Sequence, residues 1–334
     1  MPARPIHLET ACVRAKVYPT GGLLSEAEFH LGDGRWVKPL AEAPWAGEPL
    51  PADTPGHLLR LGGEFFCLPF GGCGPSHDGT PGYEAMFQEP FDQPTHGPAG
   101  NAEWTVGAAT GGSVTLTLDL PEPHAVARIE RMITLGTDRP EARFDMRVEA
   151  RRKDRVPMAF HPILRLPGQP RRLRLEADFA DGFNYPGVHP HRKTLAAPGG
   201  RFRRLDAVPG HGGQPQDFSA LPPGPIVEDN ILLAGMRGPV TATFLDEGFR
   251  LVTDWDRTQL PHAMLWLHDR ATEDRPWNGR YRGLGIEPMA ACFDGPWRVS
   301  AGENPLAAAG FTTAVEVDPA REIVLWCALV VEAI

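Results

Sequence analysis

The sequence lacks the features of several common protein classes. Its five cysteines, Cys12, Cys67, Cys73, Cys292 and Cys327, form no C-x-x-C pair. A zinc ribbon, a thioredoxin-type redox site and a dense disulfide scaffold therefore have no support. No apolar run is long enough to span a bilayer, and no charged segment followed by an apolar one opens the chain. We therefore expect a cytoplasmic protein that does not enter the membrane.

The chain also has fewer positively charged than negatively charged residues. The chain has 33 lysines and arginines against 42 aspartates and glutamates, a formal net charge of −9. Binding to nucleic acid through the bulk surface requires a basic field, so this charge argues against a nucleic-acid partner. It favours a small neutral ligand without selecting one.

Residues that break regular structure are abundant instead. The 334 residues include 37 glycines and 36 prolines, spread over the whole length, which leaves little room for long helices. Hydrophobic residues make up 42% and charged residues 22%, as in ordinary folded proteins. This composition predicts many short strands joined by turns.

Alternating apolar and polar residues indicate where those strands lie. Residues 113–120, 127–135 and 143–150 each alternate with a period of two and predict a meander of half-buried antiparallel strands. Further candidate strands are 172–175, 240–244, 249–252, 263–267, 314–317 and 322–331. Because helices between the strands are missing, a parallel sheet is disfavoured. The Pro- and Gly-rich segment 186–225 is predicted to be a surface excursion, so residues 1–334 form one all-β domain.

One candidate for chemistry lies on a predicted turn. His96 precedes Gly97 and Pro98, and Trp104 follows shortly after. A histidine on such a turn can meet a polar ligand, or it can simply be solvated.

Two other candidates interrupt apolar segments. His161 precedes Pro162, which forces an extended conformation at a strand end. It is either a general acid facing a cavity or a core histidine bonded to a backbone carbonyl. Glu287 lies between an apolar pair and Pro288. It is either a buried base with a raised pKa or the partner of a nearby arginine.

Taken in this order, these segments resemble those of the aldose 1-epimerase (galactose mutarotase) family. That family has a His-Gly turn followed by Trp, a His-Pro at a strand end, and a Glu-Pro after an apolar pair. Here the matching residues are His96-Gly97 with Trp104, His161-Pro162 and Glu287-Pro288. Segment 18–25, with its Gly-Gly turn, is similar to the family's first strand pair, and 311–331 to its closing strands. The resemblance spans most of the chain.

The resemblance implies a large antiparallel β-sandwich with a concave, sugar-binding face. It implies that Glu287 is the general base and His161 the general acid of a ring-opening reaction that needs no cofactor and no metal. It also implies that His96 binds the sugar and that a carboxylate, for which Asp229 is the nearest match, holds sugar hydroxyls. Phe87, Trp104 and Trp266 are candidates for aromatic walls. The expected partner is a small sugar, and the protein is a monomer or a homodimer.

One departure from the family pattern concerns an arginine that helps to hold the substrate. The family's turn reads His-Gly-x-x-Arg, but Gly100 occupies the last position here. Arg60 is a candidate replacement, or the substrate differs. Two other functions stay open beside a free-sugar epimerase. One is an epimerase of a phosphorylated hexose, which requires basic residues at the pocket. The other is a carbohydrate-binding or sensing protein without turnover.

Overall fold

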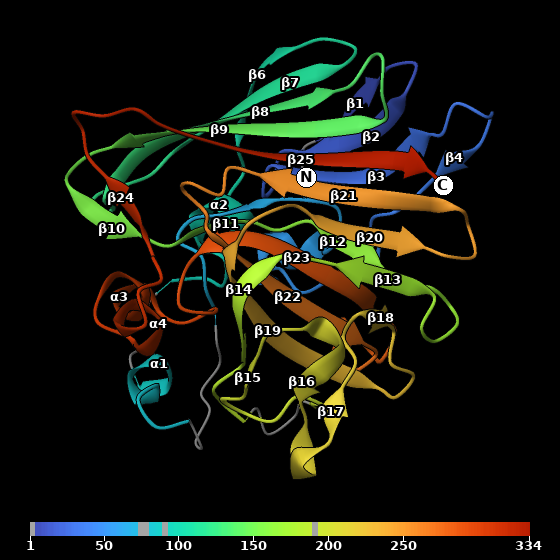
Figure 1. The fold of residues 1–334 in the computed structure, drawn as a ribbon. Coiled ribbons are helices and arrows are strands. Elements are labelled where there is room, and N and C mark those ends of the chain that lie inside the picture. Colours follow the sequence, from blue (N-terminus) through green and yellow to red (C-terminus); the bar gives the residue numbers. More distant parts are fainter. Residues whose placement is uncertain (1–3, 73–79, 89–92, 189–192) are drawn as a thin grey trace.

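The computed structural model describes residues 4–72, 80–88, 93–188 and 193–334, and antiparallel strands dominate it (Figure 1). Two large sheets contain most of these strands. The first has nine strands in the order β18 (Ala220–Leu221), β13 (Leu173–Glu176), β20 (Val240–Phe244), β21 (Phe249–Trp255), β25 (Ile323–Ala333), β9 (Glu141–Ala150), β8 (Val126–Leu135), β7 (Ser113–Asp119) and β6 (Thr105–Ala109).

The second large sheet has eight strands and packs against the first. Its order is β15 (Arg201–Phe202), β14 (Phe179–Asn184), β19 (Val227–Met236), β22 (His262–Asp269), β23 (Arg282–Ala290), β11 (Met158–Phe160) and β5 (Phe66–Cys67), and β12 (Ile163–Arg165) also pairs with β23. The expected all-β antiparallel sandwich is therefore confirmed.

Smaller elements surround the two sheets. Three small sheets consist of β1 (Ile6–Glu9), β2 (Val13–Tyr18), β3 (Leu23–His30) and β4 (Trp36–Val37); β10 (Asp154–Val156) and β24 (Val315–Val317); and β16 (Val208–Pro209) and β17 (Pro215–Gln216). The helices are α1 (Glu84–Gln88), α2 (Gly97–Asn101), α3 (Trp297–Ala301), α4 (Pro305–Ala308) and the 3₁₀ turns η1 (Gly56–Arg60), η2 (Leu205–Ala207) and η3 (His211–Gly213). Within the described ranges, none of these helices could cross a bilayer.

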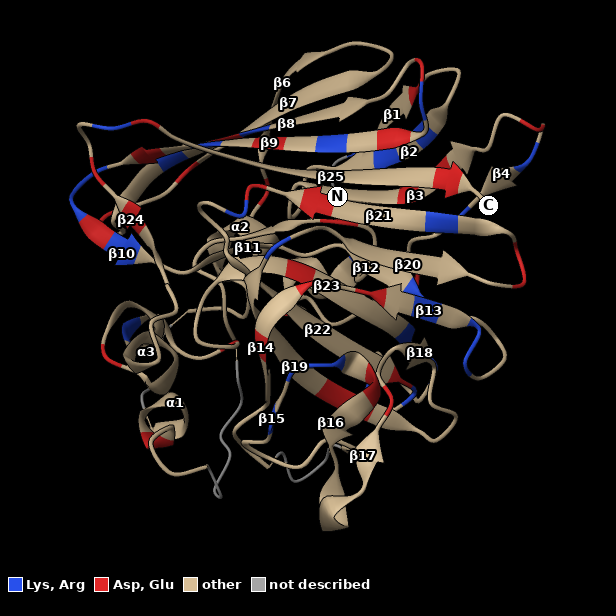
Figure 2. Cartoon of the chain, viewed as in Figure 1, with Lys and Arg blue, Asp and Glu red and all other residues tan. Residues whose placement is uncertain are grey.

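The meander predicted from alternation lies in the nine-stranded sheet as β7, β8 and β9. Its apolar residues, such as Val114, Ile129 and Phe144, belong to the main hydrophobic core and are almost fully buried. Its polar residues face outward, where charges of both signs are interspersed along the strands (Figure 2). Arg250 of β21 pairs across the sheet with Glu332 of β25 at 2.5 Å. This outer face is therefore solvated, which is why its strands alternate.

The eight-stranded sheet is covered on both faces. Alternate residues of β22, such as Leu265 and Leu267, join the core between the two large sheets. The other set of alternating residues points to the opposite face, where a second apolar cluster lies. Met264 belongs to this cluster, and Trp266 packs against it. This second face carries the candidate functional site. Because both faces are buried, β19 and β23 show little alternation, and the sequence did not predict them.

Candidate functional site

A cavity of about 160 Å³ opens on this second face of the eight-stranded sheet. Strands β19, β22 and β23 line part of it, and turns and loops outside these strands supply the rest of the lining. Its lining residues are His57, Leu61, Gly72, Thr95, His96, His161, Glu228, Met264, Trp266, Trp277, Glu287 and Asp294. Three residues predicted from the sequence, His96, His161 and Glu287, therefore line one cavity.

Strand geometry aims Glu287 into the cavity. Its neighbour Ile286 packs in the core between the large sheets, and side chains alternate along a strand, so Glu287 points the other way. Its partner across the ladder is Met264 of β22, which also lines the cavity. The side chain of Glu287 is only 1% exposed.

His161 lies where the chain leaves one strand and enters the next. It follows β11 and precedes Pro162, as the sequence predicts. Its backbone N–H donates to the carbonyl of Phe65 at 2.9 Å, and the Phe65 ring stacks on its imidazole at 4.6 Å. This packing fixes the imidazole against the cavity wall.

The reactive groups of His161 and Glu287 meet in this buried setting. Nε2 of His161 lies 3.3 Å from Oε1 of Glu287. Nδ1 of His161 and both oxygens of Glu287 form no hydrogen bond within the described protein, although all three are buried. Buried polar atoms normally have partners, so atoms of this kind indicate a site that a ligand completes.

Burial sets the protonation of the pair. It raises the pKa of Glu287 well above its usual value, and the charge of Asp294 adds to this effect. Burial, assisted by His57, lowers the pKa of His161 to about 3. Both shifts favour the uncharged forms of the two groups, a protonated carboxyl group on Glu287 and a neutral imidazole on His161.

Two more histidines extend this cluster. His96 caps α2 in the left-handed conformation (φ 64°), which agrees with the predicted turn. The rings of His96 and His161 are 4.8 Å apart, and those of His57 and His96 are 5.0 Å apart. Burial lowers the pKa of His57 to about 4 and that of His96 well below its usual value. Neutral imidazoles can both donate and accept hydrogen bonds, as sugar hydroxyls require. No motif in the sequence marked His57.

A carboxylate and two indoles also line the cavity. The Trp266 indole N–H donates to Oε1 of Glu228 at 3.3 Å. Trp277 stacks on His268 at 4.8 Å and presents a second aromatic surface. Apolar rings beside hydroxyl-binding groups suit a ring with both C–H and O–H groups.

Asp229, Trp104 and Arg60 lie outside this lining. Asp229 is one position along β19 from Glu228 and points to the other face, where it accepts a bond from the Leu195 N–H at 2.7 Å. The carboxylate at the cavity is therefore Glu228, because adjacent strand residues face opposite sides.

Trp104 is buried behind α2 and donates to the Ala99 carbonyl at 2.9 Å. The guanidinium of Arg60 lies 4.2 Å over the ring of Tyr18. Phe87 packs against Tyr185, so Trp266 alone of the three predicted aromatic walls lines the cavity. A Cβ atom at Gly100 would lie 3.2 Å from Cβ of His96, so a larger residue there would crowd the site.

Comparisons with known proteins identify the fold. No family model and no curated protein matches the sequence. Solved structures do match over almost the whole chain. A provisionally assigned aldose 1-epimerase from Escherichia coli K12 has 16% identity and a TM-score of 0.64, with 99% of each chain covered. A galactose mutarotase-like protein from Clostridium acetobutylicum has 12% identity and a TM-score of 0.64, covering 99% of this chain and 95% of its own.

The GalM/aldose epimerase homologue from C. elegans has 13% identity and a TM-score of 0.63, covering 99% of this chain and all of its own. The chain therefore has the galactose mutarotase-like β-sandwich fold. At these sequence identities the similarity establishes the fold alone, so the function has to be inferred from the residues of the site.

Proposed function

We propose that this protein is an aldose 1-epimerase, which interconverts the α and β anomers of a free monosaccharide. The observation that carries the proposal is the buried pair of His161 and Glu287, with Nε2 and Oε1 3.3 Å apart. Mutarotation needs one group that takes the proton of the anomeric hydroxyl and one that gives a proton to the ring oxygen. A pair that shares one proton between two bases supplies both.

The reaction conserves that proton. As the carboxylate of Glu287 removes the anomeric proton, His161 protonates the ring oxygen and the bond between C1 and the ring oxygen breaks. The open-chain aldehyde rotates about its C1–C2 bond, and the reverse transfers close the other anomer. This assignment requires the shared proton to move from Glu287 to His161 when the sugar binds. The mirrored assignment, with His161 as base, starts from the resting state, and the pair titrates as a unit in both.

The remaining lining residues bind the sugar. Glu228, His57 and His96 accept or donate hydrogen bonds to hydroxyls, and Trp266 and Trp277 pack against C–H groups. Together they hold the anomeric carbon beside the reactive pair, and this positioning accounts for part of the rate.

The charge of the lining favours a neutral sugar over a hexose phosphate. Among the described lining residues, Glu228, Glu287 and Asp294 are acidic, and none is lysine or arginine. A phosphate group bound there would meet carboxylates rather than the cations that normally hold it. We therefore expect free aldoses to be substrates and their 6-phosphates to react poorly.

Polarimetry of freshly dissolved α-anomers tests the proposal. A panel of aldohexoses and aldopentoses is followed with the protein, with heat-denatured protein and with buffer alone. We expect faster mutarotation of one or more free sugars with the native protein only. Spontaneous rates across the whole panel, combined with sugar binding, would instead support a carbohydrate-binding or sensing protein.

A further inference from the structure

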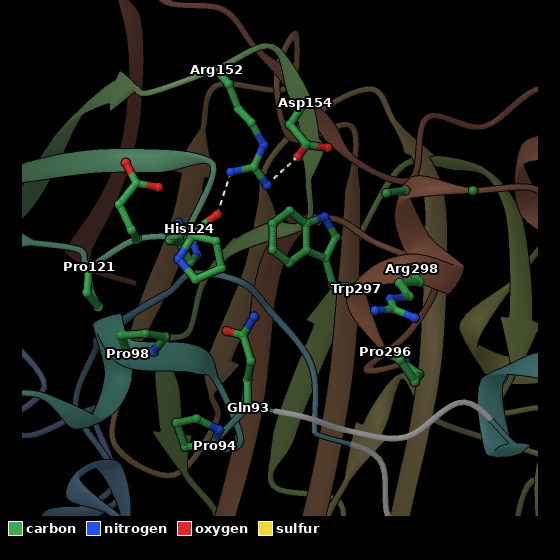
Figure 3. A pocket seen from close by; sticks show the side chains of 14 residues that line it. Gln93, Pro94, Pro98, Pro121, His124, Arg152, Asp154, Pro296, Trp297 and Arg298 are labelled. Carbon is green, nitrogen blue, oxygen red and sulfur yellow. Dashed lines mark hydrogen bonds and ion pairs between the residues drawn. The ribbon is translucent and has the colours of Figure 1, made fainter.

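A second, larger cleft lies behind the loop that carries His96. It has a volume of about 760 Å³, within the range of small-molecule sites. Gln93, His124 and Trp297 lie around it, with Arg152 and Asp154 above them (Figure 3). The side chain of Arg152 already has partners within the protein, because it donates to the Pro123 carbonyl and pairs with Asp154 at 3.1 Å.

The cleft is separate from the cavity of His161 and Glu287. Gln93, Pro94 and Pro98 line the cleft, whereas Thr95 and His96 line the cavity. The segment 93–98 therefore forms a partition with one site on each side. The mechanism proposed above uses no residue of the cleft.

His124 presents a ring nitrogen without a hydrogen-bond partner in the described protein to this cleft. The residue is 8% exposed, and its Nδ1 accepts a bond from the Val126 N–H at 3.0 Å. Burial lowers the pKa of His124, which favours the neutral ring. Nδ1 also lies 3.2 Å from the Val126 carbonyl, and in the tautomer in which Nδ1 accepts from the Val126 N–H the ring proton lies on Nε2. Nε2 is buried and has no partner within the described protein. A ligand that offers an oxygen acceptor would satisfy it.

Two further groups complete a polar set around an aromatic ring. The side-chain oxygen of Gln93 is buried and has no partner in the described chain. Arg298, on α3, is exposed and forms no side-chain hydrogen bond or ion pair with the described residues. Trp297 anchors its own indole N–H on the Arg155 carbonyl at 2.6 Å, and its ring lies 5.5 Å from that of His124. The ring is therefore held in place, with unused polar groups close by.

We propose that this cleft is a second saccharide-binding site, which holds a pyranose ring against Trp297. Sugar C–H groups pack on the indole, ring or hydroxyl oxygens accept from His124 and Arg298, and a hydroxyl donates to Gln93. Pro94, Pro98, Pro121, Pro123 and Pro296 line the same cleft. Their rings restrict backbone motion, so little conformational entropy is lost when a ligand binds.

Each site contains its own tryptophan reporter, which makes the test direct. We would titrate the ¹⁵N-labelled full-length protein with methyl α-D-glucopyranoside and methyl β-D-galactopyranoside, whose rings cannot open. The indole N–H signals of Trp297, Trp266 and Trp36 would be assigned by Trp→Phe variants. Trp36 is the control, because it lies on β4 outside both sites. We expect Trp297 to shift in a saturable way with one of the sugars, while Trp36 does not move.

Two variants test the contacts. Arg298→Ala and Gln93→Ala break no hydrogen bond within the described protein, so both should fold. Loss of a charge-assisted bond in Arg298→Ala should weaken the Trp297 response by about tenfold. The Trp266 response and mutarotation should stay as in the wild type. The test does not depend on turnover, so it stands even if Glu287 has no role in catalysis.

Three results would overturn the proposal. One is a Trp297 signal that stays fixed up to the solubility limit of both sugars. Another is a Trp297 shift that Arg298→Ala and Gln93→Ala both leave unchanged. The third is a response to a proline-rich peptide but to neither sugar, which would make the cleft a peptide site.

Discussion

A buried ion pair inside the sandwich gives the sharpest stability prediction. Arg131 lies on β8 among apolar neighbours and pairs with Glu64, and both side chains are 0% exposed. The guanidinium also lies 5.1 Å from the ring centre of Phe144. Replacing Arg131 by methionine would fill similar space but leave the carboxyl group of Glu64 alone in the core.

The cost of that change should depend on pH. Removing one partner of a buried pair costs about 3–5 kcal/mol. Burial raises the pKa of Glu64, and Arg131 opposes this effect in the wild type. In Arg131→Met the folded-state pKa rises further above the unfolded value. Below that raised pKa the folded variant keeps Glu64 protonated, whereas the unfolded chain releases this proton above about pH 4.3. The stability of the variant therefore falls as pH rises above about 4.3, at about 1.4 kcal/mol per pH unit.

Urea unfolding followed by circular dichroism at pH 5 and pH 8 measures both effects. We expect Arg131→Met to be destabilised at both values and more strongly at pH 8. Arg131→Met combined with Glu64→Leu should recover most of the loss and show no added pH dependence, because no charge stays buried. If the free energy of unfolding of Arg131→Met fell by less than about 1 kcal/mol at both pH values, the reasoning would be refuted. A loss of that size is what an exposed ion pair contributes.

Three other predictions concern protonation and binding. Both ring nitrogens of His262 bond to backbone groups, and burial lowers the pKa of this histidine to about 4. Acidification from pH 6.5 to 5 should therefore lower the free energy of unfolding of the wild type by about 2 kcal/mol. The variant His262→Gln should not show this loss. Urea unfolding of both proteins at the two pH values checks this, and equal losses would contradict it. The profile of kcat/KM against pH should fall on the acidic side near pH 3, where His161 takes a second proton, and on the basic side where Glu287 loses the shared one. Limbs at the ordinary values of about 4.3 for glutamate and 6.5 for histidine would refute the burial argument. Glu228→Ala should raise KM about tenfold with little change in kcat, as steady-state polarimetry can measure, and an equal fall in kcat would place Glu228 in the chemical step.

Most strands that the sequence predicted have one solvated face, and β22, which is buried on both faces, is an exception. β7, β8 and β9 alternate because their outer residues meet water, so a period of two was visible. β19 and β23 were missed because both of their faces are covered and nearly every residue is apolar or buried. These two strands supply Glu228 and Glu287, so the sheet that carries the site was the harder one to predict.

The residues of the candidate site were likewise predicted only in part from the sequence. His96, His161 and Glu287 were found because each stands beside Gly or Pro in a segment that resembles a family motif. Glu228 was missed by one position in favour of Asp229, because the sequence did not fix the register of β19 and a shift of one residue reverses the face. His57 reaches the cavity from the 3₁₀ turn η1, and Trp277 and Asp294 reach it from loops. None of the three stands in a motif, and only the tertiary fold brings them together.

The measurement that tests the central claim most directly is the mutarotation rate of Glu287→Gln beside a matched control. Glutamine keeps the size of the side chain but can neither accept nor hold the shared proton. Glu247→Gln is the control, because Glu247 pairs with Arg165 near the surface, outside the cavity. Polarimetry should show that Glu287→Gln loses about 10²–10⁴-fold in rate, while the rate of Glu247→Gln is unchanged. In the NMR titration, the Trp266 signal of Glu287→Gln should still respond to sugar. Near-normal mutarotation by Glu287→Gln with every sugar that the wild type accepts would contradict the proposed mechanism.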